Sequence, residues 1–341
     1  MTRVAAIDCG TNTIRLLIAE ADRDQMGRPR LQVLRRRNEI VRLGQGVDRT
    51  GVLDPEALER TLTVVAAYAA DCAELGVAPG EAARRFVATS ATRDARNRED
   101  FVAGVRRLLG IAPEVVSGQE EARLSFSGSL LGAREGAGGG AQGERAQAPR
   151  LIVDLGGGST ELVLGVDAPS AAISLDTGSV RITERFLTGG VTAEAEAAAR
   201  AEVRGLLGGA ERVVDLSAPG QLVGLAGTIT TVTAHALGLQ AFDPQALGGA
   251  ELSPQVVLAS CEAIAHSTAE QRASWGYLAP GRRDVIAAGA LVWSEVVSRV
   301  VERTTAAGRP LERVITSLYD ILDGIALSLV PTQRPAEGAG A

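Results

Sequence analysis

The stretch from Val4 to Glu20, VAAIDCGTNTIRLLIAE, decides the fold, because residues 150–166, RLIVDLGGGSTELVLGV, repeat its pattern. The two segments align without a gap, with Asp8 on Asp154, and each contains an apolar strand, an acidic glycine-containing turn and a second apolar strand. A unit of this kind that occurs twice at half-molecule spacing predicts two similar domains, each offering a turn to a shared cleft. A chance likeness between two glycine-rich hairpins is the alternative.

Apolar periodicity and capping residues predict alternating strands and helices along the rest of the chain. Strands are predicted at Val4–Asp8, Ile14–Glu20, Leu31–Arg37, Phe86–Ala88, Pro113–Val116, Leu151–Asp154, Glu161–Val166, Gln221–Leu225 and Arg313–Ser317. Helices are predicted from Asp54 to Leu75, at Arg98–Leu109, Ser117–Leu131, Pro254–His266, Asp284–Glu302 and Asp320–Leu329, and after the segment Ala226–Ile229. Residues 136–147 are expected to form a flexible surface loop, and the tail from Pro331 is expected to be disordered.

Length and composition fit an α/β protein with two medium domains. The 341 residues are too many for one comfortable core, and 45% hydrophobic residues with 3% aromatics predict aliphatic packing. No apolar run reaches the roughly 18 residues that a membrane helix needs, and Met1 leads directly into a strand-like segment. We therefore expect a soluble, cytoplasmic protein without a membrane partner. The three cysteines are far apart and are expected to be buried apolar residues rather than disulfides or a zinc site.

The absence of lysine and the acidic balance exclude several function classes. Without lysine the chain has no P-loop lysine, no Schiff-base lysine and no kinase lysine. A net charge of −6 argues against a nucleic-acid polymer as partner, although an anionic substrate still fits a local arginine-lined cleft. The two histidines, His235 and His266, are expected to be structural, since they are too few for a histidine-rich metal centre.

Three glycine-containing turns have the character of phosphate-binding segments. Backbone N–H groups in tight turns and at helix N-termini bind phosphate oxygens, and glycine lets the backbone approach closely. The segments are Gly10-Thr11-Asn12-Thr13, Gly156-Gly157-Gly158-Ser159-Thr160 and Gly227-Thr228-Ile229-Thr230. One such turn would be weak evidence, but three of them, two following an aspartate at a strand end, favour a phosphate site.

Three carboxylates next to these turns are candidates for a magnesium site. Asp8, Asp154 and Glu161 would surround the cleft, and magnesium prefers one or two carboxylates with waters and substrate phosphates as further ligands. Mn²⁺ is the expected substitute ion. The alternatives are a turn-forming aspartate at Asp8 and a solvated strand residue at Glu161.

A hydrolase also needs a group that activates water, and a carboxylate is the candidate here. Glu120 and Glu121 are adjacent at a helix start, so only one of them can face a cleft. Favourable placement of acids near a helix N-terminus explains the pair equally well. Arg93, after a strand end, could bind phosphate through its planar guanidinium.

Together these segments resemble the exopolyphosphatase/guanosine pentaphosphate phosphohydrolase (Ppx/GppA) family. The resemblance covers residues 3–329 and lies in AIDCGTNTIRLLI, FVATSATRDARN, VSGQEEARLSFSG, LIVDLGGGSTELVLG, SLDTGSVRITERF, GLAGTITTV and the segment around Asp284. It departs at Asp320–Gly324, where Leu322 replaces an arginine of many relatives. The family implies two ribonuclease-H-like domains of the actin-like ATPase superfamily with the active site between them. The domains would be residues 1–128, with 312–330 packing back on them, and 129–311; residues 331–341 would be a disordered tail.

The resemblance also implies roles for individual residues. Glu121 would activate water, Arg93 would bind a substrate phosphate, and Asp154 and Glu161, together with Asp8 from the reasoning above, would hold magnesium. The phosphate-facing residues would be Gly10, Thr11, Asn12, Thr13, Gly156, Gly157, Gly158, Ser159, Gly227 and Thr228.

The main functional hypothesis is a magnesium-dependent exopolyphosphatase that removes terminal phosphates from inorganic polyphosphate. Without the extra helical domains of long family members, a preference for short chains is expected. Alternatives are guanosine pentaphosphate (pppGpp) 5′-phosphohydrolase, a non-catalytic (p)ppGpp- or phosphate-binding regulator, and, more distantly, a phosphotransferase. The sequence leaves a homodimer open, and domain closure is expected around hinges near residues 125–135 and 305–315.

Overall fold

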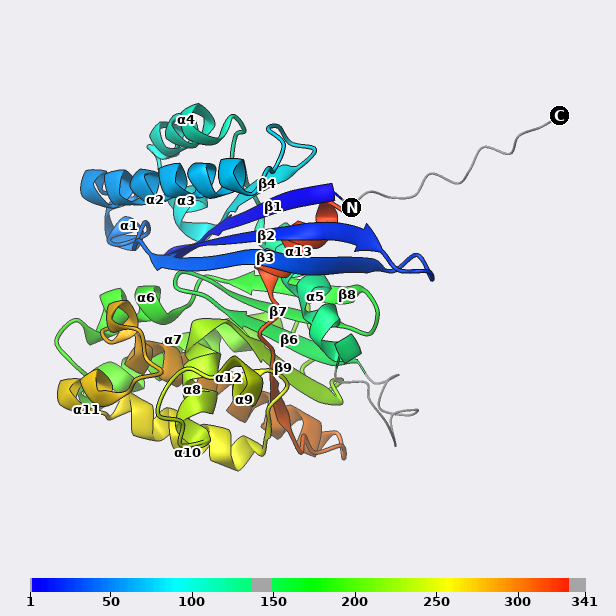
Figure 1. The fold of residues 1–341 in the computed structure, drawn as a ribbon. Helices are drawn as coiled ribbons and strands as arrows, with labels where there is room; N and C mark the ends of the chain where they lie inside the picture. The colour runs from blue at the N-terminus through cyan, green and yellow to red at the C-terminus, as the bar shows by residue number, and fades with distance from the viewer. Residues whose placement is uncertain (1, 136–148, 331–341) are drawn as a thin grey trace.

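The computed structural model describes residues 2–135 and 149–330, which form two stacked lobes (Figure 1). The predicted loop at 136–147 and the tail from Pro331 lie outside the described residues. Each lobe contains one mixed sheet with helices packed against it, and a pair of helices lies between the two sheets (Figure 1).

The first lobe contains a five-stranded sheet in the order β3-β2-β1-β4-β5. The hairpin strands pair antiparallel, whereas β4 runs parallel to β1 and β5 parallel to β4. The elements of this lobe are β1 (Thr2–Cys9), β2 (Thr13–Arg23), β3 (Pro29–Ile40), α1 (Val47–Thr50), α2 (Pro55–Glu74), β4 (Arg84–Ala88), α3 (Ser90–Asp94), α4 (Arg98–Leu109) and β5 (Glu114–Val115).

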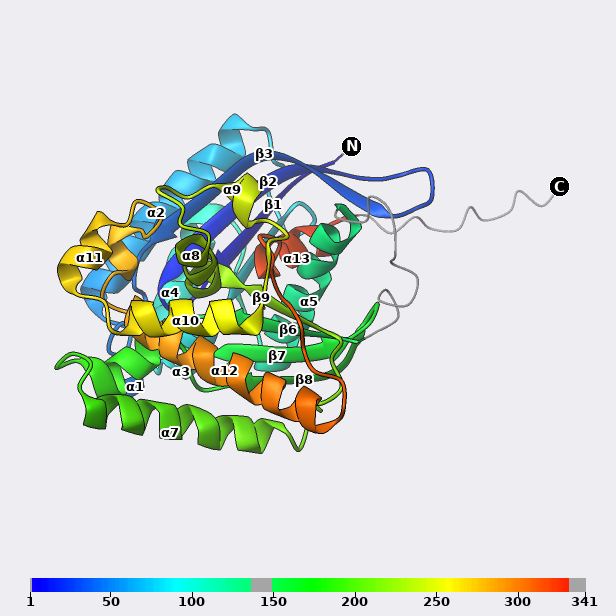
Figure 2. The same cartoon turned by 90° about the horizontal axis from the view of Figure 1, so that it is seen from below.

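The second lobe contains a six-stranded sheet in the order β10-β11-β9-β6-β7-β8. Its strands are β6 (Arg150–Leu155), β7 (Thr160–Gly165), β8 (Pro169–Leu175), β9 (Gln221–Leu225), β10 (Glu251–Leu252) and β11 (Val314–Thr316). Its helices, seen from below in Figure 2, are α6 (Ser179–Ile182), the π-helix η2 (Thr183–Leu187), α7 (Ala193–Ala210), α8 (Ala226–Ala236), α9 (Pro244–Leu247), α10 (Pro254–Ala265), α11 (Ala269–Ser274), η3 (Pro280–Arg282) and α12 (Ile286–Ala306).

The two sheets repeat one topology. The order β8-β7-β6-β9-β11 in the second lobe matches β3-β2-β1-β4-β5 in the first, with the same parallel and antiparallel pairings. The hairpins predicted at Val4–Glu20 and 150–166 are therefore the corresponding first hairpins of the two sheets. The predicted α/β class with two similar sheets is confirmed.

Local signals in the sequence account for most element boundaries. Asp54 accepts hydrogen bonds from the N–H groups of Glu56 and Ala57 at 2.9 and 3.1 Å, and Pro55 occupies the first turn, so α2 begins where the cap predicts. The long helix α7 and the strand β8 were not predicted. Helix α7 is rich in alanine, and its apolar contrast is weak, although Thr192 caps it.

Helices α5 (Gly118–Glu135) and α13 (Ile321–Ser328) cross between the sheets, as Figure 1 shows. Helix α13 packs against β1 and β2 of the first lobe, whereas α5 packs against β7 and β8 of the second. The crossing is very close, because a Cβ at Gly128 would lie 1.8 Å from the Asp320 carbonyl oxygen and one at Gly324 would lie 2.0 Å from that of Leu124. Glycine at both positions lets the backbones touch.

Aliphatic side chains fill the core of each lobe, as the composition predicts. The buried cysteines Cys9, Cys72 and Cys261 are free, which confirms that they form no disulfide. Across residues 2–135 and 149–330, no helix combines the length and the apolarity needed to cross a membrane.

Candidate active site

The turns that follow Asp8 and Asp154 have the same geometry and lie against each other. In the first, Gly10 N–H donates to the Thr13 carbonyl at 2.9 Å, and in the second, Gly156 N–H donates to that of Ser159 at 3.0 Å. A Cβ at Gly158 would lie 2.5 Å from Thr11 Oγ1, so the structure brings the two predicted phosphate-facing turns together between the lobes.

The residues that face the two aspartates across their hairpins carry opposite charges. Asp8 pairs with Arg15 in the β1–β2 register, whereas Asp154 pairs with Glu161 at the corresponding place in β6–β7. Arg15 donates to Asp8 Oδ2 from Nε at 2.9 Å and from Nη2 at 2.6 Å. The other carboxylate oxygen, Asp8 Oδ1, is buried and has no hydrogen-bond partner among the described residues. A buried oxygen of this kind fits a cation or a bound water.

Serine hydroxyls orient the two acids of the second hairpin. Ser125 Oγ donates to Asp154 Oδ2 at 2.6 Å, and Ser174 Oγ donates to Glu161 Oε1 at 2.7 Å. Sequence reasoning missed both serines. A signal for Ser125 exists, since it lies four residues after Glu121 on α5 and therefore shares its helix face.

Glu120 and Glu121, which spacing alone could not distinguish, have different surroundings. Glu120 faces outward, where Arg123 Nε donates to it at 3.0 Å and Arg85 Nη2 at 3.5 Å. Glu121 is buried, with Arg93 Nη1 3.4 Å from its Oε2. Arg93 also donates to the Val116 carbonyl at 3.0 Å, so its guanidinium lies at the start of α5.

The buried acids form one electrostatic cluster with raised pKa values. Burial, followed by the charge of Asp320, raises the pKa of Asp154 to about 6. Burial, followed by the charge of Asp154, raises the pKa of Glu161 to about 8. Burial and then the charge of Glu161 raise the pKa of Glu121 well above its ordinary value, and Asp8 contributes to the same shift. Such a cluster attracts cations, because a positive charge offsets the mutual repulsion.

The third predicted turn, Gly227 and Thr228 at the start of α8, lies against an arginine that sequence reasoning missed. A Cβ at Gly227 would lie 1.2 Å from Arg282 Nη1, so this guanidinium rests directly on the glycine. Burial and then the charge of Arg15 lower the pKa of Arg282 to about 10. Nothing in the motif GRRDVI distinguishes Arg282 from Arg283 before the fold is known.

Arg282 is available to bind an anion. Its guanidinium makes no hydrogen bond or ion pair with another described residue, although it is largely enclosed. Arg282 is only partly exposed, and a partly buried guanidinium without a protein partner gains from an anion that completes its hydrogen bonds. The arginine is therefore a strong candidate for a phosphate ligand.

The three predicted metal residues could not bind magnesium together without further ligands such as water or phosphate. Asp8, Asp154 and Glu161 are not a group of three whose ligand atoms all lie within 4.8 Å of one another. The free Asp8 Oδ1 and the raised pKa values of the acids nevertheless fit a cation that takes one or two protein ligands and completes its shell with water and phosphate, as magnesium commonly does.

A different cluster has direct metal-ligand spacing. Glu196, Glu262 and His266 on α7 and at the end of α10 offer atoms within 4.8 Å of one another. However, Arg200 donates to Glu196 at 2.7 Å and to Glu262 at 3.0 Å, so a cation already neutralises these acids. They form an ion-pair network outside the predicted site.

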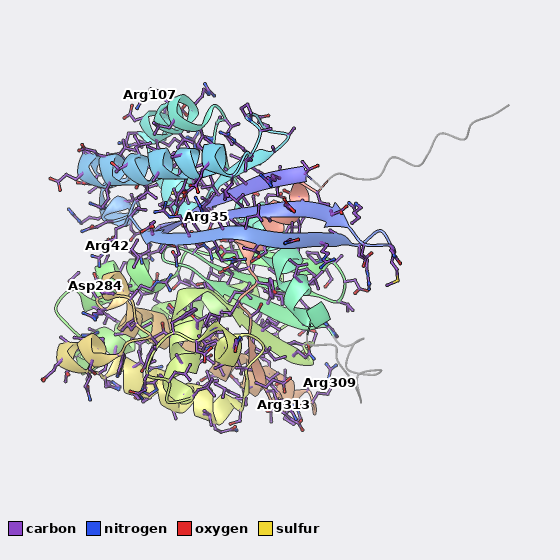
Figure 3. All side chains as sticks on the ribbon, in the orientation of Figure 1. Arg35, Arg42, Arg107, Asp284, Arg309 and Arg313 are labelled. Atoms are coloured by element: carbon purple, nitrogen blue, oxygen red, sulfur yellow. The ribbon has the colours of Figure 1, made fainter. Side chains whose placement is uncertain are left out.

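Ion pairs connect the two lobes beside the facing turns. Arg42 Nη2 lies 2.8 Å from Asp284 Oδ1, and Figure 3 shows the two residues on facing sides of the lobes. Asp48 of α1 accepts from Arg185 of η2 at 2.7 Å, and Asp94 accepts from Arg181 at 2.8 Å. Thr11 and Asn12 line a cavity of about 140 Å³ next to these contacts, together with Arg42, Gln45, Val180, Thr183, Glu184, Asp284 and Val285. The two lobes thus contact each other beside the turns.

The raised carboxyl pKa values predict how pH and magnesium affect stability. Burial raises the folded-state pKa values of Asp154 and Glu161 to about 6 and about 8, so these two groups bind more protons in the folded protein than in the unfolded chain from about pH 5 to pH 8. Carboxyls whose pKa is lowered by arginine partners, such as Asp48, have the opposite effect only at lower pH. The free energy of unfolding should therefore fall as pH rises through this window. Magnesium binds deprotonated carboxylates, so its stabilising effect should grow with pH, reaching roughly 4 °C in Tm at a hundredfold excess over Kd for a chain of this length.

Thermal unfolding with and without Mg²⁺, at about pH 6 and about pH 8, measures this effect. A magnesium-induced shift in Tm that is equal at both pH values would contradict protonation of the cluster.

Known proteins share this architecture. The crystal structure of an exopolyphosphatase-like protein superposes with a TM-score of 0.86 at 41% identity, covering 96% of this chain and 97% of that one. The Aquifex aeolicus Ppx/GppA structure has a TM-score of 0.72 at 27% identity, covering 96% and 97%. An exopolyphosphatase from Cytophaga hutchinsonii, at 23% identity, covers 98% of this chain and 100% of its own with a TM-score of 0.79, which supports the fold.

The sequence comparisons agree. Exopolyphosphatase 2 of Mycobacterium tuberculosis is 44% identical over 337 residues, covering 96% of this chain and 99% of that protein. Residues 17–307 match the Ppx/GppA phosphatase family. With two sheets of equal topology and facing glycine turns between them, this chain belongs to the Ppx/GppA phosphatase family.

Proposed function

We propose that the protein is a magnesium-dependent exopolyphosphatase that removes the terminal phosphate of inorganic polyphosphate. The observation that carries this proposal is the buried Glu121 carboxylate, which shares one electrostatic cluster with Asp8, Asp154 and Glu161 beside the two facing turns. The names of the relatives, which include exopolyphosphatases, support the substrate class.

Backbone N–H groups of the turns at Gly10–Thr13 and Gly156–Ser159 would bind the phosphate oxygens. Arg93 and Arg282 would add charged hydrogen bonds at the two sides of the cluster. Asp8, Asp154 and Glu161 would hold magnesium, which, when bound, supplies charge stabilisation for the phosphates. These contacts fix the terminal phosphorus and offset the charge that develops on its oxygens.

Glu121 would orient a water molecule and accept its proton. The water oxygen forms a bond to the terminal phosphorus while the bridging P–O bond breaks, and the electron pair of that bond goes to the leaving chain. The products are orthophosphate and a polyphosphate shorter by one unit. Burial keeps the Glu121 carboxylate basic, since it raises the pKa of this group well above its ordinary value.

Phosphate release by the purified full-length protein tests the proposal. Tripolyphosphate, a polyphosphate length series, pppGpp and ATP are offered separately, each with and without magnesium. We expect magnesium-dependent release from polyphosphate, with short chains turned over faster than long ones. Preferred hydrolysis of pppGpp in direct competition would establish the alternative activity, and binding without turnover of any substrate would indicate a regulator.

The remaining expectations are part of the same proposal. We propose domains at residues 1–128 and 129–311, with 312–330 returning to the first, and hinges near 125–135 and 305–315 that open the contacting lobes for substrate. The ion pairs Arg42–Asp284 and Asp48–Arg185 would break on opening. A cytoplasmic location, a homodimer and the lack of a nucleic-acid partner stay predictions.

A further inference from the structure

Arg15 holds Asp8 in an unusual way. A guanidinium commonly binds a carboxylate as a fork, with two N–H groups on two oxygens. Here Nε and Nη2 of Arg15 both donate to Asp8 Oδ2, and Oδ1 stays without a partner among the described residues. A residue other than Asp8 and Arg15 therefore prevents Arg15 from binding both oxygens of Asp8.

Asp320 is that residue. Its Oδ2 accepts a hydrogen bond from Arg15 Nη1, which does not belong to the Nε–Nη2 edge that faces Asp8, and Asp320 therefore pulls the guanidinium from another side. The three side chains are largely enclosed, with exposed side-chain fractions of 16% for Arg15, 6% for Asp8 and 8% for Asp320. Water therefore replaces none of these contacts easily.

Helix α13 fixes the Asp320 carboxylate itself. Its Oδ1 caps the helix by accepting from Leu322 N–H at 3.0 Å, and its backbone N–H donates to Asp323 Oδ2 at 3.1 Å. The Asp320 carbonyl lies at the crossing with α5, where Gly128 leaves room for it. The same helix α5 carries Glu121 and Ser125, so one crossing sets the positions of groups on both sides of the cluster.

We propose that Asp320 is a positioning residue that draws the Arg15 guanidinium aside and thereby leaves Asp8 Oδ1 open as a ligand for a divalent cation. The proposal rests on the proposed function, because it assigns a use to the magnesium site. Asp320 contacts Arg15 but also lies close enough to Asp154 for their charges to interact, so the test has to separate this direct effect from the effect through Arg15. Without the charge of Asp320, the guanidinium is free to shift so that Nε and Nη2 donate to different oxygens of Asp8.

Asp320→Asn isolates this effect. Asparagine keeps an oxygen that caps the helix as well as aspartate does, but it removes the charge that holds Arg15. Arg36→Gln is the matched control, since it breaks the ion pair between Arg36 and Asp323 in the same helix turn without touching Arg15 or the hydrogen bond between Asp320 and Asp323. Thermal unfolding of both variants checks that the fold is intact.

The readout is Mn²⁺ binding to the full-length protein, followed by electron paramagnetic resonance of the free ion. Asp320→Asn should weaken Mn²⁺ binding about 10–100-fold, the usual effect of losing a residue that orients a metal ligand. Arg36→Gln should bind Mn²⁺ like the wild type. In an Arg15→Gln background, Asp320→Asn should cause no further loss, because the two residues act as a unit.

The outcomes separate the two proposals. Unchanged Mn²⁺ affinity in Asp320→Asn, or an equal loss in Arg36→Gln, overturns the positioning role and leaves the proposed function standing. A wild type that neither binds Mn²⁺ nor releases phosphate removes both. A further loss in the Arg15→Gln background would mean that Asp320 acts by another route and would also overturn the inference.

Discussion

Glu121→Gln is expected to lower the rate of phosphate release about 10²–10⁴-fold, the range associated with loss of a general base. Glutamine has nearly the same shape as glutamate but cannot accept the proton of the attacking water. Substrate binding should be largely preserved, because the turn amides, Arg93 and Arg282 are unchanged. The drop should therefore appear in kcat, with KM little affected. Steady-state kinetics on tripolyphosphate and calorimetric binding measure the two effects separately.

Glu120→Gln is the matched control for this substitution. Glu120 is the neighbouring acid, but it pairs with Arg85 and Arg123 on the outside of α5. Its replacement should leave kcat unchanged. Equal losses in the two variants would indicate damage to the start of the helix rather than loss of a base, and full activity in Glu121→Gln would eliminate this glutamate as the base.

Arg282→Met is expected to lower kcat/KM about 10²–10³-fold, comparable to the loss of one oxyanion-stabilising donor. Methionine keeps much of the length and the apolar stem but removes the guanidinium that rests on Gly227. The loss in kcat/KM for polyphosphate should be larger than the loss in affinity for orthophosphate as a competitive inhibitor. Polyphosphate carries more negative charge, so it loses more when the guanidinium is removed. Kinetics over a polyphosphate length series measures it.

Arg283→Met provides the comparison for Arg282. Arg283 is adjacent in the chain, but its Nη2 donates to the Ala273 carbonyl at 3.0 Å, away from the turn at Gly227. We expect kcat/KM of the Arg283→Met variant to match that of the wild type. If Arg282→Met retained wild-type kcat/KM while Arg283→Met lost it, Arg283 and not Arg282 would be the anion-binding residue.

The sequence predicted those parts of the fold that depend on local signals. Val4–Asp8 and Leu151–Asp154 are continuous apolar runs that end in an aspartate. Such runs form strands in almost any sheet that is buried on both faces. Helix α2 could be predicted because Asp54 and Pro55 mark its start. Helix α7 buries Ala199, Val203, Leu207 and Ala210 along one face, but most of its apolar residues are alanines, so this stripe is hard to recognise in the sequence.

Site residues that depend on tertiary neighbours could not be predicted in the same way. The choice between Glu120 and Glu121 follows from the positions of Arg85 and Arg93, which come from other elements. Arg282 belongs to a surface-like charged motif and becomes a site residue only because η3 brings it to Gly227. Arg15 did carry a signal, as a charged residue inside the apolar run of β2.

Arg15 in the first hairpin and Glu161 in the second occupy corresponding positions but carry opposite charges. The two sides of the site between the lobes therefore differ in charge. One wall presents an aspartate that is already matched by a cation, and the other presents two acids side by side. A molecule with two unlike ends, such as a polymer terminus and the strand that trails from it, meets different electrostatic partners in its two orientations. Only one of the two orientations would place the polymer terminus beside the compensated charge. Two sheets of the same topology would therefore bind a polyphosphate chain in one direction only.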